Sequence, residues 1–275
     1  MANIFTELAD AWQYDFIRSA LLAGTVCAAL ASCVGYFVVV RKMAFAGHAL
    51  GHIGFAGACA GVILGCGPLP GMLALNVIAA TGMGMLGERV QKSDLVIGMM
   101  LSFALGLGSL FLSMFKGYAG QATTILFGNL LAVSQDQLLG MVVLTVVSLL
   151  VLLAIFRPLL FSSLEPELAE AKGVPLRLVS VVFYVLVAVA VAVASQIVGV
   201  LLVFTLLIGP PAIAQRFCHT IWPGIALSLG IGIGVTWVTL ILACITDWPP
   251  SFWAPTLLFI FYLLSAGCTR ISTGK

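Results

Sequence analysis

The segment from Ala44 to Gly61 places two histidines in a run of apolar, glycine and alanine residues. His48 and His52 are two of only three histidines in the chain. Their i,i+4 spacing puts both imidazoles on one face of a helix, with Cβ atoms about 6 Å apart. Neutral imidazole suits Zn²⁺ and, less strongly, Mn²⁺ or Fe²⁺. Two such ligands form an incomplete site, which suits brief binding along a path. The alternative is that both rings bond to carbonyls and hold helices together.

Composition decides the class of protein that must position these histidines. Of the 275 residues, 62% are hydrophobic and 8% are charged, and the mean hydropathy is +1.19. A soluble domain of this length could not keep so much apolar surface out of water. The apolar runs are continuous and do not alternate, so helices satisfy the backbone within lipid. We therefore expect an all-α, polytopic membrane helical bundle.

Charged residues and Gly/Pro punctuation divide the chain into nine predicted spans. The sixth and seventh meet at Ser195 to Ile197, so we expect one of them to be broken or partly re-entrant. The stretch Ala119 to Val133 is too polar for a span and is expected to form an outer helix and loop. The predicted spans are Phe16–Val40, Ala44–Cys66, Gly71–Gly87, Leu95–Phe115, Gln137–Phe156, Leu178–Ala194, Val198–Phe217, Trp222–Ile245 and Phe252–Gly267.

The distribution of basic residues predicts the orientation of this single transmembrane domain, residues 1–275. With nine spans and the N-terminus outside, ten of the twelve lysines and arginines fall in inner loops, and only Arg18 and Lys116 stay outside. The C-terminus is then cytoplasmic. Residues 1–15 carry three acidic residues where a signal peptide has basic ones, so we expect an interfacial segment. The seven cysteines form no CxxC pair and are interpreted as small membrane residues, not as disulfides or a metal cage.

The largest predicted inner connection is the segment 157–177. Pro166 suits the first position of a helix, the glutamates before and after it favour the helix N-terminus, and Gly173 supplies a stop. We expect a two-turn helix from Pro166 to Lys172 on the cytoplasmic face, with an ordinary solvated loop helix as the alternative. The chain has no G-x-x-x-x-G-K-[ST] phosphate loop. An energy source must therefore be another protein, and this helix is a reasonable place for an ATPase to dock.

Two further features concern the depth and shape of the path. At 1.5 Å per residue, His48 lies about 6 Å and His52 about 12 Å from the start of their predicted helix, nearer the inner boundary than the midplane. Pro210 and Pro211 lie inside an apolar run and predict a kink, which either lines a path or merely suits packing. His219 is interpreted as a loop residue and not as a ligand.

Three segments resemble one family, the permease subunits of bacterial ABC importers for zinc, manganese and iron(II). RKMAFAGHALGHIGFAG, at 41–57, is similar to that family's basic loop followed by Phe-x-Gly-Asp-Ala-Leu-Ser-His and Ala-Gly. LEPELAEAKGVP, at 164–175, resembles its cytoplasmic coupling segment. LLVFTLLIGPPAIAQRF, at 201–217, resembles its proline-containing late helix. His48 stands where the family usually has Asp, and Gly51 where it usually has Ser.

The resemblance implies a type II ABC importer-like permease in the bacterial plasma (inner) membrane. It implies a second permease copy, forming a homodimer or occasionally a pair, a cytoplasmic ABC ATPase dimer and an extracytoplasmic metal-binding protein. It implies metal contact at His48 and His52, and contact with the ATPase by Glu165, Glu167, Glu170, Lys172 and Gly173. No permanent cofactor and no nucleic acid are expected; the metal, zinc first and manganese or iron(II) second, is cargo.

Two alternatives belong to other classes. An intramembrane metalloenzyme would use the His-x-x-x-His spacing, but the zincin pattern needs Glu directly after the first His, and Ala49 is there. A haem-binding electron carrier needs imidazoles on opposite faces of the haem, and these two share one helix. The sequence therefore favours a metal permease.

Overall fold

The structure is a computed structural model that describes residues 15–86, 94–114, 126, 128, 134–200, 203–218, 220–246 and 248–273. The described residues form helices and no strand, so the predicted all-α class is confirmed. The helices are α2 (Asp15–Val40), α3 (Ala44–Ile63), α4 (Pro68–Leu86), α6 (Asp94–Met114), α8 (Gln135–Leu164), α9 (Pro166–Ala171), α10 (Leu176–Val198), α11 (Val203–Phe217), α12 (Ile221–Thr246) and α13 (Pro250–Thr273).

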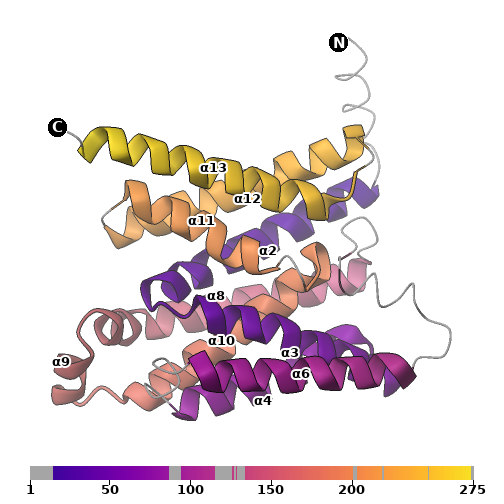
Figure 1. The fold of residues 1–275 in the computed structure, drawn as a ribbon, viewed down its shortest axis with the longest axis horizontal. Helices are drawn as coiled ribbons and strands as arrows, with labels where there is room; N and C mark the ends of the chain where they lie inside the picture. Colours follow the sequence, from indigo (N-terminus) through magenta and orange to yellow (C-terminus); the bar gives the residue numbers. More distant parts are fainter. Residues whose placement is uncertain are drawn as a thin grey trace, which may run out of the picture.

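The helices run side by side and reverse direction from one to the next (Figure 1). Helix α2 begins at one end of the bundle, and α13 ends at the other. The short helix α9 lies at the same end as the end of α13. We call this end, marked by α9, the α9 end. The basic residues Arg41, Lys42 and Arg177 flank helix ends there, which makes it the cytoplasmic end by the positive-inside rule.

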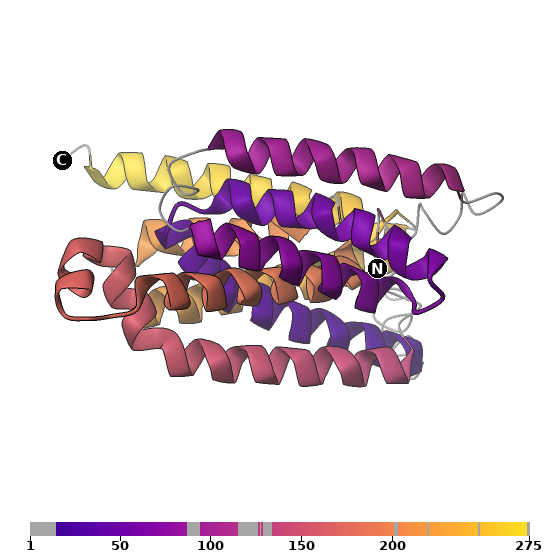
Figure 2. The ribbon, with the colours of Figure 1, turned by 90° about the horizontal axis from the view of Figure 1, so that it is seen from below.

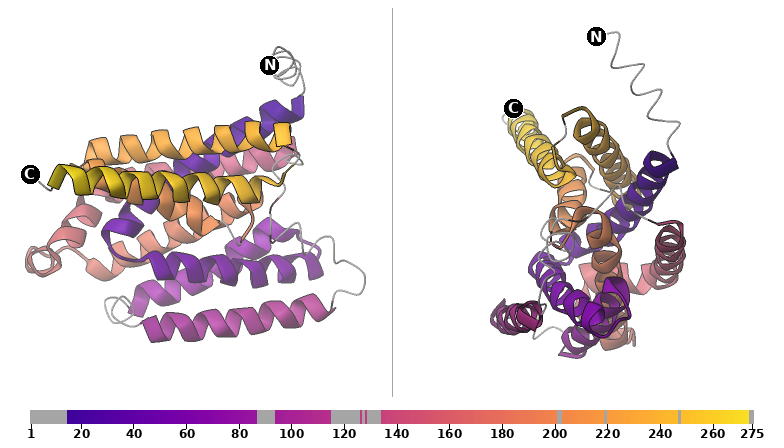
Figure 3. Two further views of the ribbon diagram at one scale, coloured as in Figure 1. Left: turned by 45° about the horizontal axis from the view of Figure 1, so that its top comes forward. Right: turned by 90° about the vertical axis from the view of Figure 1, so that its right-hand side faces the viewer.

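Burial divides the helices into central and outer ones. Helices α2, α3 and α10 are the most buried: 67%, 72% and 72% of the residues in an 18-residue apolar stretch of each helix lie inside the bundle. Helices α6, α8 and α13 have only 17%, 22% and 17% buried. Figure 2 and the right-hand view of Figure 3 show α6 and α8 at opposite edges. The outer helices expose leucine, valine and phenylalanine, as expected of side chains that face lipid.

Eight described helices, not nine, are long and apolar enough to cross a membrane. All nine predicted runs are helical, but α11 has only 15 residues, about 22 Å at 1.5 Å per residue. The predicted junction at Ser195 to Ile197 is also wrong, because α10 continues through it to Val198. The chain leaves the helix at Gly199, whose φ of +84° suits glycine. Helix α11 is therefore a short segment that starts inside the bundle.

The inner connection is shorter than predicted. Helix α8 has 30 residues and runs through Arg157 and Pro158 to Leu164, so the first eight residues of the segment 157–177 are helical. The hydroxyl of Ser162, in this last part of α8, donates to the carbonyl of Leu159. Helix α9 follows directly, so the connection consists of α9 and the turn at Gly173. Pro158 is tolerated inside α8 because neighbouring groups in membrane helices can satisfy carbonyls that a proline frees.

Glycines bring two pairs of helix backbones into contact. A Cβ on Gly57 of α3 would lie 2.5 Å from the carbonyl oxygen of Gly71 in α4, which is closer than any Cβ can approach. A Cβ on Gly35 of α2 would collide with the carbonyl oxygen of Leu207 in α11. Pro211 has no N–H to bond that carbonyl within the helix. Small residues are the usual means of close approach between membrane helices.

Several predictions lie outside the described residues. They are the interfacial segment 1–15 except for its last residue, the loop assigned to His219, and most of Ala119–Val133. Within that last stretch Gly128 is described, with a φ of +75°, and a Cβ there would collide with the backbone of Ile197 and Gly199. Cys27, Cys33, Cys59, Cys66 and Cys218 form no disulfide bond.

Candidate metal path and coupling helix

The two histidines of α3 lie together, as their spacing predicts. Their ring centroids are 4.8 Å apart, and the planes meet at 84°. A tetrahedral zinc ion about 2.0–2.1 Å from one nitrogen of each ring would set the centroids about 5 Å apart. Both side chains are half-buried, whereas most of α3 is buried. The pair therefore has the spacing of two ligands that share an ion and lies on the part-exposed side of the helix.

The pair lies deeper in the bundle than its place in α3 suggests. A Cβ on Gly47 would meet Leu207 at 3.0 Å, and one on Gly51 would meet Val203 at 3.4 Å. Helices α3 and α11 are thus antiparallel, and Phe204 lies against His48. From Phe204, α11 continues for about 20 Å to its last residue at the α9 end. The pair therefore lies about 20 Å from the α9 end of α11, which is further than its distance from the start of α3 alone suggests.

The histidines have no third ligand of the usual kind within the part of the chain that the structure describes. No cluster of three or more His, Cys, Asp or Glu side chains occurs there. Zinc sites in proteins usually have three or four protein ligands. The described residues of one copy therefore offer an ion at most a weak, two-imidazole site.

A phenylalanine completes a row of three rings at this place. The ring of Phe204 lies 5.2 Å from that of His48, at 76°, and His48 in turn lies edge-on to His52. Phe204 is the second residue of α11, directly after the connection that follows α10. Pro210 and Pro211 lie six and seven residues further along the same helix, where they free two carbonyls from helical bonding.

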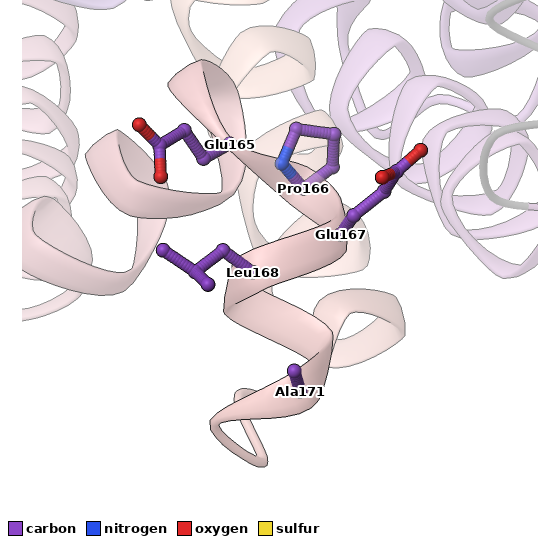
Figure 4. Close-up of a pocket in the computed structure, with 5 residues that line it drawn as sticks. All are labelled: Glu165, Pro166, Glu167, Leu168 and Ala171. Atoms are coloured by element: carbon purple, nitrogen blue, oxygen red, sulfur yellow. The ribbon is translucent and has the colours of Figure 1, made fainter.

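Helix α9 forms an exposed, acidic surface. It has six residues, and Ala169 is its buried one. An open cleft of about 450 Å³ runs along it, lined by Glu165, Pro166, Glu167, Leu168 and Ala171. In Figure 4 the carboxylates of Glu165 and Glu167 point in different directions, away from the ribbon. The prediction of a helix that starts at Pro166 is confirmed.

The remaining predicted coupling residues shape the end of α9. Glu170 is exposed. The ammonium of Lys172 lies 5.2 Å from the centre of the Phe161 ring in α8. Gly173 has a φ of +78°, and its N–H donates to the carbonyl of Glu170. The structure therefore brings Glu165 and Glu167 to one cleft, while Lys172 folds back on α8 and Gly173 makes the turn.

Comparison with known proteins identifies the family. The model of the family described as ABC 3 transport family matches residues 13–269. The chain belongs to the ABC 3 transport family. This confirms the resemblance carried by the segments at 41–57, 164–175 and 201–217.

Relatives within the ABC 3 family cover most of the chain. The manganese import system permease protein ScaB of Streptococcus parasanguinis is 32% identical over 83% of this chain and 82% of its own length. The high-affinity zinc uptake system membrane protein ZnuB of Haemophilus influenzae is 30% identical over 76% and 80%. The solved structure of PsaBC from Streptococcus pneumoniae in complex with Fab matches with a TM-score of 0.86, at 26% identity, over 95% of each chain.

These matches fix the class of the chain. It is a multi-pass permease of the ABC 3 family in the bacterial plasma membrane. The named relatives are a permease protein of an import system and a membrane protein of an uptake system, which favours a transport subunit over the intramembrane metalloenzyme and the haem-binding carrier.

Sequence reasoning missed three residues of the ABC 3 permease that the structure places near the histidines or their helix. Phe204 contacts His48 across two helices, Gly35 admits the backbone of α11, and Asn76 of α4 is fully buried beside Gly54. Phe204 and Gly35 carry no local signal, because their roles depend on contacts with distant parts of the chain. Asn76 is a polar residue in an apolar run, and that pattern alone could have marked it.

Proposed function

We propose that this chain is the membrane-spanning subunit of an ATP-driven importer of divalent transition metal ions, and that the ion passes His48 and His52. The observation that carries the proposal is the pair of rings 4.8 Å apart. An ionisable group inside a membrane is costly and usually faces a path or a protein partner. Here two of them lie side by side on a part-exposed face.

A second copy of the chain would complete the site. The half-buried face of α3 should not meet lipid, because imidazole nitrogens would then lack hydrogen-bond partners. Two copies related by a two-fold axis would each present the same surface. If the α3 faces meet, four imidazoles surround one ion, which matches the coordination number of zinc. A non-identical permease with its own ligands is the alternative partner.

The energy source would be a pair of ATPase subunits at the α9 end. The chain lacks a phosphate loop, and the cleft along α9 offers two exposed carboxylates and Leu168, which is 45% exposed. Movement of an ATPase would be transmitted through α9 to α8 and α10, which flank it in sequence. An extracytoplasmic metal-binding protein would deliver the ion at the opposite end.

Zinc is the cargo that the residues favour. The family relatives include proteins named for manganese and for zinc, so sequence similarity alone does not identify the transported metal. His48 replaces the Asp usual in the family, and imidazole favours Zn²⁺ where a carboxylate favours Mn²⁺. Manganese or iron(II) is the alternative cargo of the same kind of permease.

The test is metal uptake by cells that lack their own zinc and manganese importers and carry the chain with its ATPase and binding protein. Zinc uptake by the double variant His48→Ala/His52→Ala should fall at least about tenfold, because both imidazoles that would bind the metal are removed from the path. The control is Cys66→Ala, in the exposed turn after α3. Unchanged zinc accumulation in the double variant, at normal protein level, would refute the assigned path.

The cargo is tested by His48→Asp in the same cells. This variant restores the residue usual in the family and should shift the ratio of zinc to manganese uptake toward manganese, by about tenfold. The ratio is measured with both ions present. A ratio equal to that of the wild-type chain would remove the argument for zinc while leaving the path intact.

A further inference from the structure

A ring from another helix holds one of the two histidines. Phe204 lies edge-on to His48 with centroids 5.2 Å apart, while His48 lies edge-on to His52. Aromatic rings favour this edge-to-face arrangement, with centroids 4.5–7 Å apart. His48 is thus fixed from two sides, by its neighbour on α3 and by α11.

The backbone brings this contact about. Gly47 and Gly51 flank His48 on the side of α3 that faces α11, and they leave room for Leu207 and Val203. The absence of side chains at these two positions lets α11 pack directly on α3. The ring of Phe204, one residue after Val203, therefore packs against the His48 ring.

The position of Phe204 in its helix gives it limited freedom. It lies in the segment Val203–Gly209, between Gly199, which caps the end of α10, and the prolines at 210 and 211. The N–H of Val203 donates to the carbonyl of Gly199, so the segment is tied to the end of α10. A change in the packing of α10 or α11 would move Phe204 relative to His48.

We propose that Phe204 is a positioning residue for metal transfer, which holds the His48 imidazole in the orientation that shares an ion with His52. This inference rests on the proposed function and adds the residue that sets the affinity of the path. A histidine ring on a membrane helix would otherwise turn about its side-chain bonds. The Phe204 contact selects one orientation and reduces the entropy lost when an ion binds.

The test is a double-mutant cycle between positions 204 and 48, read as the KM and the maximal rate of zinc uptake in the cells described above. Phe204→Leu keeps an apolar side chain and removes the ring. We expect its KM for zinc to rise roughly two- to tenfold, the range that an aromatic edge contact supports, with little change in maximal rate. Phe204→Tyr keeps the ring and should stay within about twofold of wild type.

The cycle is closed in a His48→Asp background, which keeps a metal ligand but offers no ring to Phe204. There Phe204→Leu should change KM by less than about twofold. The matched control is Phe217→Leu, the same substitution at the exposed end of the same helix, which should leave KM unchanged in both backgrounds.

The outcomes separate this inference from the proposed function. An equal effect of Phe204→Leu in both backgrounds, or none in the wild-type background, would overturn the positioning role even if the histidine variants lose uptake. Unchanged uptake in His48→Ala/His52→Ala would instead overturn the proposed function itself. A rise in KM confined to the His48 background, with rescue by Phe204→Tyr, supports both.

Discussion

Helices α3 and α9 carry the two groups of residues to which we assign function, and they are held in opposite ways. Helix α3 is buried and touches the backbones of its neighbours through glycines, and its histidines lie on the side that is left part-exposed. Helix α9 has six residues, and the carboxylates of Glu165, directly before it, and of Glu167 and Glu170 within it are exposed to solvent. A group that binds an ion needs a fixed position, whereas a group that binds a partner protein needs an accessible surface. Substitutions in α3 should therefore lower the stability of the permease, whereas substitutions in α9 should weaken binding of its partner and leave stability unchanged.

The largest expected effect is at the crossing of α3 and α4. Gly57→Ala adds a Cβ that would lie 2.5 Å from the carbonyl of Gly71. Because the neighbour is backbone and cannot turn aside, the helices must separate, and we expect a loss of about 3 kcal/mol or more in the free energy of unfolding. Thermal unfolding of the purified permease in detergent measures this.

The matched control for that crossing is Gly82→Ala in α4. A Cβ at Gly82 meets nothing within 4 Å, and alanine favours a helix by roughly 0.5–1 kcal/mol over glycine. The control should be neutral or slightly stabilising. Equal destabilisation by both substitutions would mean that the close approach of α3 to α4 is not what limits stability.

Helix α9 should respond in the opposite sense. Glu167→Lys reverses a charge in the cleft and should weaken binding of the ATPase about ten- to a hundredfold, because a like-charge contact at an interface costs several kcal/mol. The unfolding temperature of the permease itself should not move, since Glu167 is exposed. Co-purification of the ATPase with the permease measures the first effect.

A second variant tests independently whether α9 is the docking element. Gly173→Ala strains the left-handed turn, at φ +78°, that ends the helix, and should also reduce co-purification without unfolding the bundle. If either α9 variant gave an intact complex with wild-type uptake, α9 would not be the docking element. If either destabilised the bundle as much as Gly57→Ala, the contrast between the two helices would be wrong.

The sequence predicts the parts of this structure that depend on local pattern. Each predicted span corresponds to a helix, and Pro166 and Gly173 bound α9 as expected. The i,i+4 spacing of His48 and His52 was sufficient to predict that their rings meet. Hydropathy, helix period and turn chemistry are properties of neighbouring residues, and here they suffice.

What depends on packing was not predictable from the same patterns. The run from Val198 to Phe217 is largely apolar, yet its helix starts only at Val203, because Gly199 ends α10 within the bundle. The depth of the histidines follows from contacts of Gly47 and Gly51 with α11, and not from their distance to the start of α3. Phe204 meets His48 only because two glycines let distant segments touch.

The smallest expected effect has the opposite sign and lies within the same helix contact as Gly57. Asn76 of α4 is 0% exposed, and neither atom of its amide has a partner among the described residues. The hydroxyl of Ser195 donates to the carbonyl of Ala192, and the amide of Gln196 donates to the sulfur of Met72, four residues before Asn76, at 3.5 Å. Asn76→Leu replaces a buried amide by an apolar side chain of similar size, so we expect stabilisation by about 1 kcal/mol.

The unfolding temperature of Asn76→Leu should therefore rise by a few degrees, and a fall would mean that the amide is bonded in the native protein. Zinc uptake by the same variant sharpens the comparison between packing and function. A variant that is more stable but slower would assign Asn76 to a conformation in which α4 meets different neighbours, because residues retained at a cost to stability commonly serve activity. A variant that is more stable and equally active would place Asn76 outside the transport cycle, and leave His48, His52 and Phe204 as the polar and aromatic groups of the path.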